Sequence, residues 1–95
     1  MKKNMKKNMK NTVSIIGVGD TVDFEVDPSF EAAKKALNDA FVIPIRFPSG
    51  DVMLVDEDGD PRNLPFNERA SRIAGQRLVG PVAFVQKHLV KRVIG

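Results

Sequence analysis

Four arginines and one asparagine between positions 62 and 77 are the side chains whose types and spacing best fit a binding site. Guanidinium groups donate paired hydrogen bonds to phosphate oxygens, and the start of a helix adds free backbone amides that favour an anion. The alternative is that these arginines pair with acidic residues of the same domain or of a neighbouring subunit. The predicted site, for an anionic ligand such as a cyclic nucleotide, consists of Arg62, Asn67, Arg69, Arg72 and Arg77.

An acidic stretch and a single histidine are the other groups with chemical potential. Residues 56–60 read D-E-D-G-D, but the spacing of a calcium-binding loop is absent. The Asp58-Gly59 pair is better explained as a turn, because glycine tolerates a positive φ. His88 has no acid or nucleophile beside it in the sequence, and the chain has no cysteine. We therefore expect no metal site, no cofactor and no enzyme active site.

Charge is distributed unevenly along the 95 residues. Residues 1–10 carry five lysines and no acid, residues 11–60 carry three bases and eleven acids, and residues 61–95 carry seven bases and one acid. The net charge of +3 therefore conceals an acidic segment and a basic segment. Because two such segments can attract each other across a subunit boundary, we expect a homo-oligomer.

Residues 1–11 repeat lysine, asparagine and methionine without an apolar face. This composition predicts a disordered leader, which either keeps the chain in solution or binds nucleic acid through its lysines. Translation upstream of a start at Met5 or Met9 is the other explanation. No apolar run reaches the roughly 18 residues of a membrane span, and no signal peptide is recognisable. We expect a cytoplasmic protein that does not bind a membrane.

Residues 12–95 predict a single α+β domain that positions the arginines. Alternating apolar and polar residues predict strands at 13–18 and 21–26, joined by a type II′ turn at Gly19-Asp20, and two more at 41–47 and 52–55. Pro44 has no amide to donate, so its strand should lie at a sheet edge or carry a bulge at that position. The almost continuous apolar run at 78–85 predicts a central strand buried on both faces.

Two or three short helices complete the domain. Asp27 and Pro28 should begin the first, which packs on the sheet through Phe30 and Leu37. A terminal helix is predicted from the apolar spacing between positions 89 and 94.

The helix that carries the arginines is predicted at residues 68–74. Asn67 is a good N-cap, Gly75 is typical of a helix end, and the apolar side of the helix includes Ile73. The fold class is therefore α+β, with a small, mainly antiparallel sheet of about five strands.

Residues from about 13 to 85 resemble an uncharacterised family of small phage and mobile-element proteins, a domain of unknown function. The resemblance rests on V-D-E-x-G at 55–59, L-P-x-N-x-x-A at 64–70 and V-G at 79–80. The chain departs from the family at Asp39-Ala40, where a glycine pair is expected, and at Pro81. The family implies no catalytic residue, but it implies a gene carried by a phage or plasmid and a product in the bacterial cytoplasm. We interpret the shared motif as structural first.

We therefore expect a non-enzymatic, phage-type binding protein that counters a host defence or modulates its host. In one version it holds an anionic, nucleotide-like ligand, and in the other it docks on a host protein. Two alternatives stay open. One is a nucleic-acid-binding accessory protein that uses the lysine-rich leader and the basic C-terminal third. The other is a homo-oligomeric interaction module assembled by opposite charges.

Overall fold

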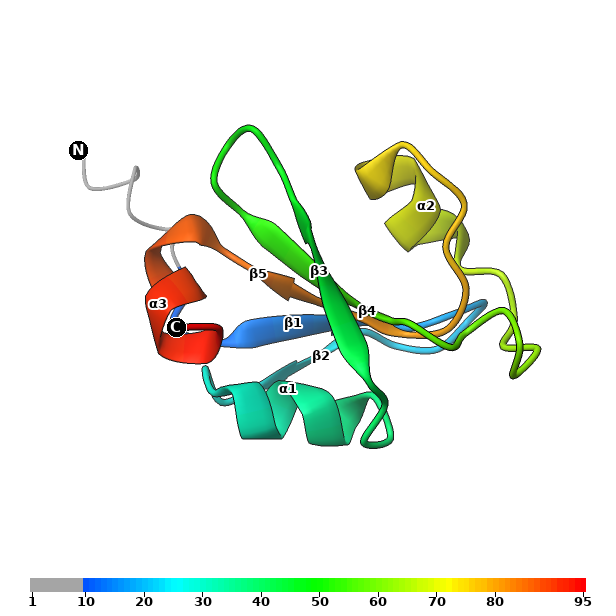
Figure 1. Ribbon diagram of the computed structural model, residues 1–95, viewed down its shortest axis with the longest axis horizontal. Helices are drawn as coiled ribbons and strands as arrows, with labels where there is room; N and C mark the ends of the chain where they lie inside the picture. The colour runs from blue at the N-terminus through cyan, green and yellow to red at the C-terminus, as the bar shows by residue number, and fades with distance from the viewer. Residues whose placement is uncertain (1–9) are drawn as a thin grey trace.

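The computed structural model describes residues 10–95, so residues 1–9 of the leader predicted at 1–11 lie outside this part. Five strands form one antiparallel sheet with the order β2-β1-β5-β4-β3. The strands are β1 Val13–Ile16, β2 Phe24–Val26, β3 Val42–Arg46, β4 Val52–Asp56 and β5 Val82–Val85. The helices are α1 Phe30–Ala36, α2 Glu68–Ala74, the 3-10 helix η2 Lys87–Leu89 and α3 Val90–Val93. The predicted α+β fold class is confirmed (Figure 1).

The sheet has an apolar core on each face. Helices α1 and α3 cover the face that includes Ile15 and Leu54, where Leu89 is also buried. Helix α2 and the segment after it cover a smaller core around Ile16 and Met53. Neighbouring residues of a strand point to opposite faces, which is why Ile15 and Ile16 belong to different cores. Figure 1 shows α2 at the opposite side of the view from α3.

Strand β5 is central, as its apolar sequence predicts. It lies between β1 and β4, and Val82, Ala83 and Val85 are all fully buried. The strand begins at Val82 rather than at residue 78, because Gly80 has a φ of 77° that interrupts the extended chain.

Strand β3 lies at an edge, as Pro44 predicts. The amide of Phe47 donates to the carbonyl of Asp51, and the amide of Glu57 donates to the carbonyl of Phe41. Odd-numbered residues of this segment therefore bond to β4, and the even-numbered ones turn their backbone groups outward. Pro44 is one of the outward residues, so its missing amide costs the sheet no hydrogen bond and blunts the free edge.

The start of α1 differs from the prediction. Ser29, not Asp27, is the N-cap, and its hydroxyl accepts a hydrogen bond from the amide of Ala32. Residues 27–29 form a tight turn in which the Ser29 amide donates to the Asp27 carbonyl, so the helix begins later than predicted. Leu37 is buried as expected, whereas Phe30 in the first turn is 43% exposed.

The β1–β2 hairpin is present, but its connection is longer than predicted. The Thr21 amide donates to the Val18 carbonyl, so a turn does form at Gly19-Asp20. The paired strands stop short of this turn, which therefore does not join them directly as a type II′ hairpin turn would. Residues 17–23 form a loop that contacts Arg69 of α2.

The predicted amphipathic C-terminal helix is confirmed as η2 followed by α3. Leu89 and Val93 are buried in the first core, while Lys91 and Arg92 are exposed. Between residues 10 and 95, no helix has the length and apolar character needed to cross a membrane.

Candidate functional site

Helix α2 forms at the residues that the sequence predicts. The side chain of Asn67 caps its start, and Gly75 ends it in the left-handed conformation with a φ of 72°. Ala70 is fully buried, but Ile73, which was predicted to be buried, is 50% exposed. The apolar contacts of α2 with the core come from two small side chains, Ala70 and Ala74, so much of the helix surface faces solvent.

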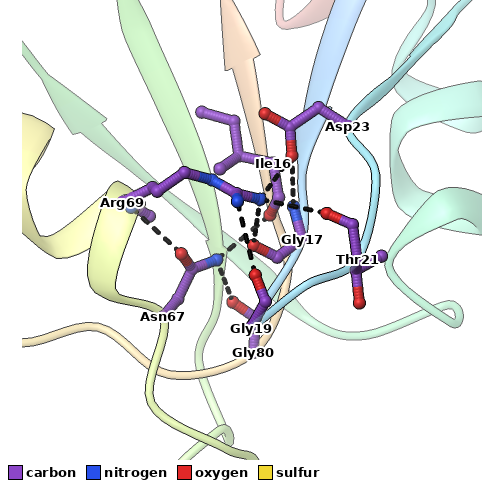
Figure 2. Close-up of polar contacts among 9 residues, drawn as sticks. Ile16, Gly17, Gly19, Thr21, Asp23, Asn67, Arg69 and Gly80 are labelled. Carbon is purple, nitrogen blue, oxygen red and sulfur yellow. Dashed lines mark hydrogen bonds and ion pairs between the residues drawn. The ribbon is translucent and has the colours of Figure 1, made fainter.

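Asn67 is fully buried, and its side chain makes three hydrogen bonds. Oδ1 accepts from the Ala70 amide at 3.0 Å, and Nδ2 donates to the carbonyls of Ile16 at 3.0 Å and Gly80 at 2.8 Å (Figure 2). One side chain thus caps α2 and ties it to β1 and to the segment that enters β5. Asn67 thus lies inside the fold, where it and Arg69 are among the residues that line a small depression of about 200 Å³.

Arg69 is also engaged within the fold (Figure 2). Its Nη2 donates to the Asp23 carboxylate at 2.6 Å, to the Gly17 carbonyl at 2.8 Å and to the Thr21 carbonyl at 3.3 Å. Its Nη1 donates to the Gly19 carbonyl at 3.4 Å. The guanidinium group therefore holds the loop of residues 17–23 against α2. We call the contacts of Asn67 and Arg69 the inner contact of α2.

Arg62 pairs with the end of β4. Its Nη1 lies 3.0 Å from Oδ2 of Asp56, whose side chain is only 4% exposed. The other carboxylate oxygen of Asp56 accepts a hydrogen bond from the Asp58 amide at 2.8 Å. This pair orders the acidic turn at residues 56–60. Among residues 10–95, no three His, Cys, Asp or Glu side chains are grouped so as to hold a metal ion.

Residues of the motif quoted above for the family resemblance meet in one place. A Cβ on Gly59 would lie 2.7 Å from the Val79 side chain, and a Cβ on Gly80 would lie 2.6 Å from the Leu64 side chain. The Gly80 amide donates to the Pro65 carbonyl at 2.7 Å. Gly59 is thus required by close packing and not by a positive φ, which corrects our explanation of the turn. These contacts give the motif a structural role.

Arg72 and Arg77 instead line an open groove on the outer side of α2. Its volume is about 530 Å³, and its lining residues are Phe66, Glu68, Ser71, Arg72, Gln76 and Arg77. Phe66 is 51% exposed. We call this depression the α2 groove. It brings together two of the five predicted site residues.

Phe66 was not predicted as a site residue, although the sequence holds a signal for it. An apolar residue just before an N-cap normally packs against an apolar residue in the second turn of the helix. Here the second-turn position is Ser71, which cannot provide that contact, and the hydroxyl of Ser71 accepts from the Leu78 amide at 2.8 Å instead. The ring of Phe66 is therefore left facing solvent.

The ion pairs beside the α2 groove are exposed. Arg72 Nη2 lies 2.7 Å from Glu68 Oε2, with both side chains 71% exposed. Arg77 Nη1 lies 2.9 Å from Asp60 Oδ1, with the two side chains 64% and 72% exposed. Exposed pairs contribute about 0–1 kcal/mol, so an incoming phosphate can replace either carboxylate at little cost. Loss of either ion pair would thus leave the fold intact.

All four predicted arginines therefore pair with a carboxylate of their own chain, as the alternative interpretation held. Three of these pairs join the basic segment 61–95 to the acidic segment 11–60. They are Arg62 with Asp56, Arg69 with Asp23, and Arg77 with Asp60. Part of the charge complementarity that was expected to join subunits is thus satisfied within one chain.

His88 is exposed and contacts the beginning of the described chain. Its Nε2 lies 2.6 Å from the carbonyl oxygen of Lys10, and the Lys10 amide donates to Gln86 Oε1 at 2.9 Å. These contacts attach residue 10 to the segment that starts η2.

Comparison with known proteins does not assign the chain to a family. No protein-family model, curated protein or solved structure matches the chain. The function therefore has to be argued from the α2 groove and the contacts around it.

Proposed function

We propose that the chain is a non-enzymatic binding protein whose α2 groove holds a small anionic ligand with a flat ring, of the nucleotide class. The observation that carries the proposal is the half-exposed ring of Phe66 in the same groove as Arg72 and Arg77. Stacking of a base on an aromatic side chain contributes about 1–3 kcal/mol. Guanidinium groups bind phosphate oxygens through paired hydrogen bonds.

A single nucleotide fits this groove better than a nucleic-acid strand does. One aromatic ring and two arginines provide one stacking position and one phosphate position. Glu68 lines the groove and Asp60 pairs with Arg77 beside it, so a phosphate backbone that continued past the groove would meet two carboxylates. Cyclic nucleotides, which are compact and carry little charge beyond their phosphates, are the ligand class that we favour.

The biological setting of this proposal comes from the sequence resemblance alone. In a phage-infected bacterial cell, a protein that holds a nucleotide signal would keep that signal from the host system that reads it. This role requires affinity and no chemical step, which agrees with a groove built from stacking and ionic groups.

Isothermal titration calorimetry with cyclic AMP, cyclic GMP and cyclic di-GMP tests the proposal. We expect at least one of these compounds to bind, and we expect Phe66→Ala, Arg72→Ala and Arg77→Ala each to weaken binding by about tenfold or more. Arg92→Ala is the matched control, because it removes an exposed arginine from α3, away from the groove. This control should bind as the wild type does.

Two outcomes would contradict the proposal. One is the absence of heat with all three nucleotides. The other is equal affinity of the wild type and the Arg72→Ala/Arg77→Ala double variant. Tighter binding of oligo(dT) than of any mononucleotide would instead favour the nucleic-acid alternative.

A further inference from the structure

The two free edges of the sheet are built differently. On β3, Pro44 removes an outward amide and the exposed Arg46 adds a charge, and both features discourage another strand from pairing. On the opposite edge, β2 has the sequence F-E-V, which contains no proline and whose one charged residue, Glu25, is acidic. Within residues 10–95, no strand pairs with this outer edge of β2.

The outward backbone groups of β2 belong to Glu25. In an antiparallel ladder, consecutive residues of a strand bond alternately to one neighbouring strand and to the other. Odd-numbered residues of β3 bond to β4, so even-numbered residues of β4 bond to β5. By the same alternation, even-numbered residues of β5 bond to β1, and odd-numbered residues of β1 bond to β2. Phe24 and Val26 consequently bond to β1, while the amide and carbonyl of Glu25 point away from the sheet.

A mostly apolar groove of about 450 Å³ lies between this edge and α1. It is lined by Phe24, Val26, Asp27, Ala32, Lys35 and Ala36. Phe24 is 48% exposed, and Val22, two residues earlier, is 81% exposed. We call this depression the β2 groove. In an added strand, the residue opposite Glu25 would point to the same face as the Glu25 side chain. The residues on either side of it would point to the other face, where the β2 groove lies.

We propose that β2 binds an extended segment of another protein, which adds a strand to the sheet and inserts an apolar side chain into the β2 groove. Backbone hydrogen bonds to Glu25 attach the segment, and the groove selects its side chain, as in other cases of strand addition. The contact needs no rearrangement of the fold, because both the backbone groups and the groove are already exposed.

The charges around this edge select a basic segment. Asp27 lines the β2 groove, Glu31 lines an adjoining depression together with Asp27, and neither carboxylate forms an ion pair with another residue in the described range. Lys35 is the cation that lines both depressions, so two carboxylates face one ammonium group there. The carboxylates of Asp23 and Glu25 are 43% and 38% exposed, although each has one cationic partner. Glu25 lies on one face of β2, and Phe24 and Val26 lie on the other. A segment in which basic residues alternate with apolar residues is therefore complementary to both faces.

A second copy of the same strand is a poor partner. A two-fold pairing of β2 with itself, centred on Glu25, would place identical carboxylates directly opposite each other, which is destabilising. The proposed occupant is therefore a different protein with an alternating basic and apolar strand.

Fluorescence anisotropy with a labelled hexapeptide of alternating lysine and valine tests the proposal. We expect saturable binding that weakens by about tenfold when the central amides of the peptide are N-methylated, since these amides would bond to β2. A peptide of alternating glutamate and valine should not bind. Equal binding of the N-methylated peptide, or no binding of the parent peptide, would overturn the proposal.

Variants of β2 locate the contact. Glu25→Pro removes the outward amide in the way that Pro44 does on the other edge, and we expect binding to weaken by about tenfold or more. Glu25→Gln is the matched control, which keeps the amide and removes only the charge, and its loss should stay below about threefold. Phe24→Thr keeps a strand-forming residue but removes the ring, and it should weaken binding as Glu25→Pro does.

Circular dichroism identifies a variant that does not fold. If Glu25→Pro does not fold, the affinity of Phe24→Thr decides the question. Unchanged affinity in the folded variants, or a dimer by light scattering that is lost in Glu25→Pro, would contradict the inference. Because Phe66, Arg72 and Arg77 take no part in this contact, its failure would leave the proposal for the α2 groove unaffected.

Discussion

Arg69 and Arg72 belong to the same helix, three positions apart, yet they have different roles. Arg69 donates to a carboxylate and to backbone carbonyls of the loop at residues 17–23. Arg72 makes one exposed ion pair at the edge of the α2 groove. A separation of three residues leaves the side chains about 60° apart around the helix, which is enough to direct one toward the loop and the other toward solvent. The neighbouring segment, and not the residue type, decides whether an arginine stabilises the fold or remains accessible to a ligand.

The largest expected effect is the loss of the inner contact of α2 at Asn67. Asn67→Ala removes an N-cap, which costs about 1 kcal/mol. It also leaves the buried carbonyls of Ile16 and Gly80 without the donor that they share, at about 1–3 kcal/mol for each unsatisfied group. We expect the free energy of unfolding to fall by about 3 kcal/mol or more, measured by urea denaturation.

Ser29→Ala is the matched control, because Ser29 caps α1 through a single hydrogen bond. It should cost only about 1 kcal/mol. If the Asn67 and Ser29 variants lose the same stability, the bonds from Asn67 to Ile16 and Gly80 contribute nothing beyond capping.

The second prediction separates the two arginines directly. Arg69→Ala should lower the free energy of unfolding by about 1–2 kcal/mol, because it removes bonds to loop carbonyls and to a half-exposed carboxylate. Arg72→Ala should change it by less than about 0.5 kcal/mol, since its pair is highly exposed. A double-mutant cycle of Arg69→Ala with Asp23→Ala measures the first pair, and one of Arg72→Ala with Glu68→Ala measures the second. Equal coupling energies would remove the distinction between the two sides of α2.

The bounds of α2 were predictable because their signals are local. Asn67 and Gly75 act through hydrogen bonds and backbone angles within one turn of the helix. The partners of Arg69 were not predictable, because Gly17 and Asp23 lie more than forty positions away in the sequence. No periodic pattern specifies which loop packs against which side of a helix.

The same limit applies to the rest of the site and to the sheet. The apolar run at 78–85 indicated a central strand, but neither its neighbours nor the break at Gly80 can be inferred from alternation alone. The arginines were recognisable by type, whereas their accessibility depends on distant carboxylates. The exposure of Phe66 could be inferred only from Ser71, a polar residue at the helix position that normally packs against the residue before the N-cap.

The smallest predicted effect concerns the ionic contact of Glu25 in the sheet. This contact has more partners than the exposed pair of Arg72 and fewer buried groups than the inner contact of α2. Partial burial raises the pKa of Glu25, but hydrogen bonds from Thr12, Ser14 and Lys10, together with the Lys10 charge, outweigh it and hold the pKa below its ordinary value of 4.5. A carboxyl group with a lowered pKa in the folded state stabilises the fold above that ordinary value, and this contribution is lost as the pH falls through the lowered pKa. Thermal unfolding between pH 6 and pH 3 should therefore show a decline below about pH 4.5 that is shallower in Glu25→Gln. Ser14→Ala, which removes the hydroxyl donor that lies within hydrogen-bond distance of both oxygens of this carboxylate, should give an intermediate slope. Identical slopes in all three proteins would mean that the contact is as weak as the exposed pairs beside the α2 groove.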